Sequence, residues 1–597
     1  MTHPVQIHSA RRRSAAALAV GVALASLAST MALAQVAVER NLPPPVARHG
    51  AGLQLGADNF AGSTDETPLG ANLVGVHVLG PKEKPRATPG VVVGDIGPLD
   101  HQRVADAVAP FIGQPISRKL ISQVQAAIAR VYREAGYPFV SVTLPPHDAS
   151  RGLLQVRVVE FHAGKVKVDG AGDDAKLADR IRLAPGERIE AAKLEEDLDW
   201  INRNPYRTAQ GVFAPGLGVG ASDFTLKVSD GKPWQVFGGY SDTGQKATGY
   251  DRYFIGAGAL IAPFNDAVVS YQFTGSSDFW DDRGFDGGVD AARYVSHSAR
   301  IVIPTFARQA LEISPDYIVT RQNQDAYVAF NNTIFELPII YRSAVSNLLP
   351  GLYLGDVYGG AEFKQAERKT YFDQIDIGHG EADVFQLVFG WADHFSDAWG
   401  ETSLNARVKV NPGHVLDDNT DAAWSLFSSG RVTSVDYAYG QIDANRVTKL
   451  PAGFSWVVQA SALVADQALP DTEQLALGGL DAVRGYTLDD GAVDQGFFWR
   501  NDLRAPAISL AGAPAPSEVS PYAFFDFAAG RTFNSALPRT TEMASLGAGA
   551  DLRVGSYVNA TLIGAYALRD ARDDLPATVT GTRSGDWTVQ ARVTLSY

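Results

Sequence analysis

The stretch WTVQARVTLSY, Trp587–Tyr597, decides the fold class. Its odd-numbered residues are apolar or aromatic and its even-numbered residues are polar, so an extended strand has one apolar and one polar face. Similar alternation runs through Tyr253–Leu260 and Ala267–Phe273. Such segments, each about ten residues long with turn residues between them, are typical of an outer-membrane β-barrel. A water-soluble β-protein is the alternative.

Counting outward from these segments gives sixteen strands, an even number as in single-chain bacterial barrels. One connection, 262–265, is short, whereas 274–291 is long, which fits periplasmic turns and extracellular loops. We therefore predict an all-β transmembrane barrel of about 16 antiparallel strands over residues 231–597. The predicted strands are 233–243, 250–262, 266–275, 292–304, 309–321, 332–346, 352–368, 380–394, 398–411, 434–449, 452–467, 496–506, 519–530, 543–555, 556–568 and 586–597.

The beginning of the sequence predicts export. Arg11–Arg13 form a basic region, Ala15–Thr30 is apolar, and Ala32–Ala34 gives the small-residue cleavage pattern, so 1–34 is predicted to be a signal peptide. A retained membrane anchor is the alternative, although the apolar region is short for a span. Without its three arginines the mature chain is more negative than the formal −14, which argues against nucleic acid as a partner. The chain has no cysteine, which excludes disulfides and thiolate metal sites.

Residues 72–230 have a different pattern, with two successive α+β modules predicted at 72–162 and 163–230. In the first, strand 72–79 precedes helices 101–111 and 117–135 and strands 139–144 and 153–159. In the second, strand 165–168 precedes helices 175–182 and 191–202 and strands 208–212 and 223–228. Residues 35–71 are predicted to be a flexible linker. The excursion at 80–95 has no explanation from the sequence.

Five short motifs occur in one order along this architecture. They are YREAGY at Tyr132–Tyr137, NRNPYR at Asn202–Arg207, GYSDTG at Gly239–Gly244, VRGY at Val483–Tyr486 and YAFFD at Tyr522–Asp526. Together they resemble the outer-membrane transporters of two-partner secretion, the haemolysin secretion/activation (TpsB) family. The resemblance covers nearly all of the predicted mature chain. It implies two periplasmic POTRA modules (small α+β domains) and a sixteen-stranded barrel that is monomeric and surrounded by outer-membrane lipids. It also implies a secreted partner exoprotein, recognised through its N-terminal secretion domain.

The resemblance assigns a role to the VRGY motif. In the family, this motif tips a loop that folds back into the pore, where its arginine meets an acid of the inner wall. Here the motif is Val483, Arg484, Gly485 and Tyr486, and the candidate acid is Asp526. The residues support this pairing independently, because alternation along Pro521–Phe527 places Asp526 and Phe524 on one face, and a lipid-facing Asp is disfavoured. A solvated loop arginine is the alternative.

Two further expectations follow from the resemblance. A cargo polypeptide would add as a strand beside the second helix of the first module. The candidate groove residues are Gln123, Ala127, Arg130, Val140 and Val142. Some relatives also close the pore with an N-terminal helix. Here the segment 35–40 is short and Pro43–Pro45 break any helix. A plug helix is therefore in doubt, and without one closure would rest on the Arg484 loop alone.

Other classes fit the sequence less well. It has no Gly-x-Ser-x-Gly or His-Glu-x-x-His motif, and its eleven histidines lack metal-ligand spacing, so we expect no enzyme, cofactor or metal. A barrel-assembly factor of the same superfamily usually has three or more POTRA modules, whereas two are predicted here. A passive porin would need no such modules. The identity of the cargo does not follow from the sequence.

Overall fold

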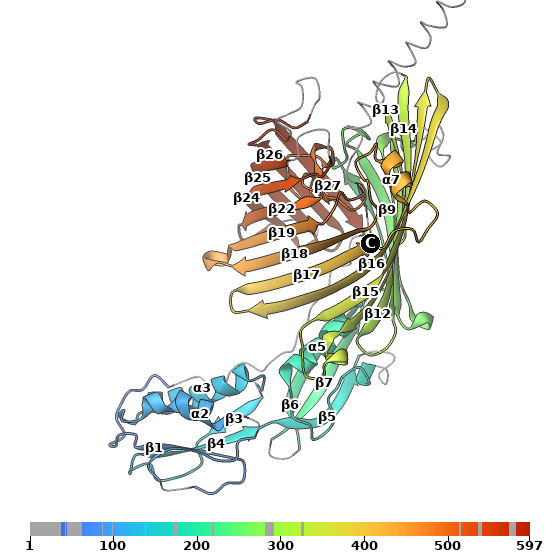
Figure 1. Cartoon of the computed structure of the whole chain (residues 1–597). Helices are drawn as coiled ribbons and strands as arrows, with labels where there is room; N and C mark the ends of the chain where they lie inside the picture. Colours follow the sequence, from blue (N-terminus) through green and yellow to red (C-terminus); the bar gives the residue numbers. More distant parts are fainter. Residues whose placement is uncertain are drawn as a thin grey trace, which may run out of the picture. The chain divides into compact units, whose positions relative to one another are not determined.

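The fold was taken from a computed structural model (Figure 1). It describes residues 38–597 apart from 42, 44–62, 86–87, 98, 138, 171–176, 218–219, 281–291, 324–326, 511, 513–514, 535–539 and 572–580. The predicted signal peptide and most of the predicted linker lie outside these residues. The described residues form two compact units, one containing 234–348 and 354–597 with the described residues of 38–43, the other containing those of 45–233 with 349–353.

The first module is a four-stranded sheet in the order β2-β1-β4-β3, covered by two helices. Its elements are β1 (Gly75–Leu79), β2 (Gly90–Val93), α2 (His101–Val108), α3 (Arg118–Glu134), β3 (Val140–Thr143) and β4 (Leu153–Glu160). Asp100 and Ser117 cap the helices as predicted, because each side chain accepts a backbone N–H of the first turn. The unexplained excursion contains β2, which pairs in parallel with the outer edge of β1.

The second module is a three-stranded sheet in the order β5-β7-β6. Its elements are β5 (His162–Asp169), α5 (Ala191–Asn202), β6 (Arg207–Pro215) and β7 (Ala221–Asp230). The sheet and α5 bury a core that includes Leu198, Ile201, Phe224 and Leu226. Part of the predicted helix 175–182 lies outside the described residues.

The remaining strands close into a barrel whose order follows the sequence (Figure 1). They are β8 (Trp234–Ser241), β9 (Arg252–Ile261), β10 (Ala267–Gly275), β11 (Tyr294–Pro304), β12 (Gln309–Ile313), β13 (Asp316–Asn323), β14 (Val328–Ala344), β15 (Asp356–Phe372), β16 (Ile375–Asp397), β17 (Gly400–Asn411), β18 (Tyr437–Lys449), β19 (Ser455–Ala465), β22 (Gln495–Arg504), β23 (Ile508–Ser509), β24 (Ser517–Arg531), β25 (Thr540–Val554), β26 (Val558–Ala567) and β27 (Trp587–Ser596). Two short helices, α6 (Val345–Leu348) and α7 (Asp421–Phe427), lie between strands.

The predicted sixteen-stranded barrel is confirmed. β12 and β13 share one position because both pair with β11 and β14, and β23 continues the position of β22 along β24. The alternating stretch Trp587–Tyr597 contains β27, which closes the barrel by pairing with β26 and β8. Its odd-numbered side chains point outward, since Trp587, Val589 and Leu595 are exposed. Among the described residues, no helix has the length and apolar character needed to span a membrane.

Candidate functional site: a loop fastened inside the barrel

Residues 466–494, between β19 and β22, form a long connection that we call the pore loop. It contains the two-residue pair β20 (Leu475–Ala476) and β21 (Ala492–Val493), so it doubles back on itself. Its apolar side chains are buried with residues of the barrel wall in one cluster. The cluster includes Leu469, Leu477, Val483, Tyr486 and Val493 from the loop and Tyr437, Leu463, Ala528 and Met543 from the strands. The pore loop is therefore packed against the wall.

At the tip of the pore loop, Arg484 lies against Asp526 of β24. Arg484 Nε and Nη2 donate to the two carboxylate oxygens of Asp526, each over 2.7 Å, and the Arg484 backbone N–H donates to the same group over 3.2 Å. The side chains are 1% and 0% exposed, respectively. The guanidinium also lies over the ring of Phe524, 3.8 Å from its centroid. This bidentate, buried geometry is the strong form of an ion pair.

The other residues of the VRGY motif shape the turn that presents Arg484. Val483 is fully buried in the apolar cluster. Gly485 has φ +89°, and a Cβ added there would lie 2.9 Å from the Cβ of Ala565, so only glycine fits without strain. The Tyr486 hydroxyl lies within hydrogen-bond distance of the carbonyl oxygens of Ala544 and Arg569, at 2.9 and 2.8 Å, which ties the tip to β25 and to the residues after β26.

Asp502 of β22 is a second acid at this site that the sequence analysis missed. Its Oδ1 accepts from Arg484 Nη2 over 2.6 Å, and its Oδ2 accepts from Arg504 over 3.1 Å. Arg504 in turn reaches Asp551 of β25 over 2.7 Å. Arg500, Asp502 and Arg504 occupy alternate positions of one strand, so their side chains lie on the same face. This row of charged residues, which must face the lumen, is the sequence feature that could have predicted Asp502 as part of the site.

A segment ahead of the first module, residues 38–41, also lies in the lumen. Glu39 accepts from Arg252 of β9 at 2.8 and 2.7 Å, and Arg252 is fully buried. Arg40 donates to Glu336 of β14 at 2.8 and 2.6 Å. Residues 38–41 therefore occupy the barrel together with the pore loop. The expectation that closure would rest on the Arg484 loop alone applies to a chain without a plug helix, and it stays a prediction. The residues before 38, where a plug helix would be, lie outside the described residues.

The candidate groove of the first module is only partly assembled. β3 is an edge strand beside α3, as the groove requires. Gln123 and Arg130 are exposed on the helix, but Ala127 is buried, and Val142 belongs to the core. Val140 is half-buried against the same core. The side chain that spans from α3 to β3 is Gln125, whose amide donates to the Val142 carbonyl over 2.8 Å. The sequence analysis missed this residue.

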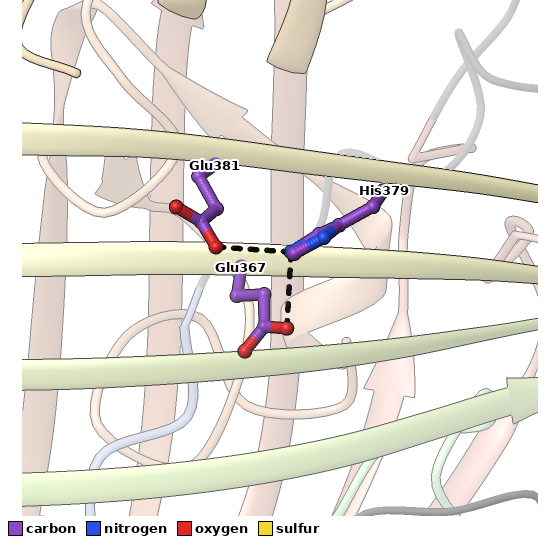
Figure 2. A group of neighbouring side chains, drawn as sticks. All are labelled: Glu367, His379 and Glu381. Carbon is purple, nitrogen blue, oxygen red and sulfur yellow. Dashed lines mark ion pairs between the residues drawn. The ribbon is translucent and has the colours of Figure 1, made fainter.

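A third group of charged side chains lies on β15 and β16 (Figure 2). Glu367 and Glu381 face each other across the two strands, and His379 Nε2 lies 3.1 Å from an oxygen of each. Their possible ligand atoms are close enough to share a metal ion. The pairing register of β15 and β16 brings them together. However, all three are partly exposed and Lys369 Nζ already lies 2.8 Å from Glu367, so we interpret the group as a surface ion-pair network.

Comparisons with known proteins identify the class of this molecule. Residues 357–554 match the family described as haemolysin secretion/activation protein ShlB/FhaC/HecB, and residues 88–160 match the ShlB-type POTRA domain. The outer membrane transporter CdiB-2 of Burkholderia pseudomallei is 22% identical over 72% of this chain and 71% of its own. The heme/hemopexin transporter protein HuxB of Haemophilus influenzae is 19% identical over 76% of this chain and 78% of its own.

The solved structures agree on the fold. The structure of CdiB from Escherichia coli superposes with a TM-score of 0.63 at 17% identity and covers all of both chains. The structure of CdiB from Acinetobacter baumannii gives a TM-score of 0.52 at 14% identity. The chain belongs to the haemolysin secretion/activation family of outer-membrane transporters. It is an outer-membrane protein with POTRA modules in the periplasm, and its function is the two-partner secretion of an exoprotein.

Proposed function

We propose that the two modules receive the N-terminal secretion domain of one long exoprotein, and that the pore loop controls its passage through a monomeric barrel. The observation that carries this proposal is the buried Arg484–Asp526 pair, because it attaches the pore loop to the inner wall of a closed barrel. The predicted domain boundaries, with the modules at 72–162 and 163–230 and the barrel at 231–597, are part of the proposal.

The Arg484–Asp526 pair supports a role in transport because it keeps the apolar residues of the pore loop against the barrel wall. An undocked pore loop would expose its buried apolar residues, such as Leu477 and Val483, to the lumen along the path of the cargo. Exposing these residues is unfavourable in water. Docking through Arg484 keeps them against the wall, so the docked loop is the form that we expect to support secretion.

The first module supports a role in recognition through its free edge. β3 pairs with β4 on one side only, which leaves the other side open to an added strand. The Val142 carbonyl on this edge is occupied by Gln125, and an incoming strand would replace that bond. The other edge of the sheet is β2, but β3 lies beside α3, as the predicted groove requires, so β3 is the edge that we expect the secretion domain to use.

Co-expression with a candidate exoprotein, a long exported protein encoded in a neighbouring reading frame, tests the proposal. We expect that protein to accumulate in the medium only when the transporter is present. A proteoliposome version with the same two purified proteins separates the alternatives. Flux of small solutes without polypeptide transport, or assembly of other barrels, would contradict the proposal.

A further inference from the structure

Glu473 lies in the first half of the pore loop, ahead of Arg484, and is buried with its side chain 1% exposed. Lys364 Nζ lies 2.6 Å from Glu473 Oε1, and Lys409 Nζ lies 3.6 Å from Oε2. The Gln386 amide and the Tyr439 hydroxyl donate to Oε2 over 2.8 and 2.7 Å. This loop carboxylate therefore has four partners on the barrel wall.

The two attachments lie on different parts of the wall. The partners of Glu473, which are Lys364, Gln386, Lys409 and Tyr439, belong to β15, β16, β17 and β18, respectively, whereas Asp502 and Asp526 belong to β22 and β24. β19 lies between these two groups of strands in the barrel. The pore loop therefore reaches from one part of the wall to another and is fastened at both.

The ion-paired groups around Glu473 balance in charge, and we call them the lumen cluster. Asp316, which lies opposite Glu336 on β13, accepts from the Ser298 hydroxyl and forms no ion pair among them. The carboxylates of the lumen cluster are Glu336, Glu362 and Glu473, and its cations are Lys364, Lys409 and Arg40. Five of these side chains belong to the barrel wall or the pore loop. The sixth, Arg40, belongs to residues 38–41, which we call the N-terminal segment, and without it the ion-paired acids outnumber the cations by one.

Arg40 also contacts the pore loop directly. Its Nη2 donates both to Glu336 and to the Thr472 carbonyl, the latter over 2.7 Å, and Thr472 precedes Glu473. One guanidinium thus joins the N-terminal segment, the wall and the loop. A buried charge that loses its partner is destabilising, so withdrawal of Arg40 would leave three close carboxylates with two cations.

We propose that Glu473 is the second anchor of the pore loop and that Arg40 makes this anchor conditional on the N-terminal segment. This inference rests on the proposed role of the pore loop. Departure of the segment weakens the hold on Glu473, and undocking of the loop removes a partner of Arg40. Because coupling between two sites is reciprocal, each release promotes the other. Glu473 and Arg40 are positioning residues in this scheme.

Ion conductance of the purified full-length chain in planar bilayers tests the inference without any cargo. Glu473→Gln and Arg40→Gln should each raise the frequency of large openings about tenfold or more, the effect of losing a hydrogen bond to a charged group. Combining them should give less than the product of the two effects, because both act in one cluster. Glu367→Gln, the same change on the outward face of β15, is the matched control and should leave openings unchanged.

A compensating variant distinguishes charge balance from simple loss of packing. Glu336→Gln added to Arg40→Gln restores equal numbers of acids and cations, so we expect openings to return toward the wild-type frequency. Unchanged openings in Glu473→Gln would overturn the anchor. Effects that multiply independently, or no rescue by Glu336→Gln, would overturn the coupling. Secretion measured on the same variants is separate: if the openings change as expected but secretion does not, the transport role of the loop fails while the anchor stands.

Discussion

Replacing Arg484 with alanine should nearly abolish secretion while the barrel still folds and inserts. The change removes the bidentate pair with Asp526 and the bond to Asp502, and it leaves only the backbone N–H of residue 484 donating to Asp526. A water-filled lumen would limit the loss to about 1.5–3 kcal/mol, the value for a hydrogen bond to a charged group. The two side chains are almost fully buried, so the larger penalty for an unpaired buried charge, about 3–5 kcal/mol, applies.

That penalty acts on the docking equilibrium of the pore loop, which shifts by about 10²- to 10⁴-fold. It does not act on the strand ladder, which closes all the way around the barrel. The assay is secreted exoprotein per inserted barrel, with insertion checked by the heat-dependent mobility of the folded barrel. Arg484→Lys keeps the charge but loses the two-pronged geometry, so it should secrete at an intermediate level. Normal secretion by Arg484→Ala would refute the reasoning.

Three further predictions concern the modules, the lumen and the turn. Deletion of residues 70–230 should leave an inserted barrel that secretes nothing, as measured by exoprotein in the medium, because the modules recognise the cargo; normal secretion would be incompatible with this. Without cargo, the wild-type pore should conduct modestly in planar bilayers, and deletion of 480–491 should raise the conductance, whereas an unchanged open-porin conductance in both would argue against a loop-filled lumen. Gly485→Ala should lower secretion, since a side chain at φ +89° is strained and meets Ala565, costing about 1 kcal/mol or more; an equal level of secretion in the variant would show that the turn tolerates the strain.

The barrel could be predicted from the sequence because each strand has one face toward lipid. That requirement imposes the alternation seen in Trp587–Ser596. The same alternation was sufficient to predict the approximate position of every strand of the barrel. Strand ends were less predictable. β16, for example, runs over Ile375–Asp397, longer than the predicted 380–394, and its first residues are exposed. Where both faces of a hairpin meet water, the alternation that marks a strand disappears.

The candidate site was predictable only in part. Arg484 and Asp526 were found because a family motif marks one and strand alternation orients the other. Asp502, Glu473 and the partners of Glu39 and Arg40 were missed, because their contacts join residues far apart in sequence and arise only when the barrel closes. β2 was missed for a related reason: its strand pairs in parallel with β1, and four residues carry no clear period.

The central claim is that Arg484 and Asp526 act through one contact, and a double-mutant cycle tests it most directly. Secreted exoprotein per inserted barrel is measured for Arg484→Ala, Asp526→Ala and the double variant. Asp526→Ala should be the milder single change, because Arg484 keeps Asp502 at 2.6 Å. The account predicts that the double variant secretes no less than Arg484→Ala alone. Two defects that multiply independently would contradict it.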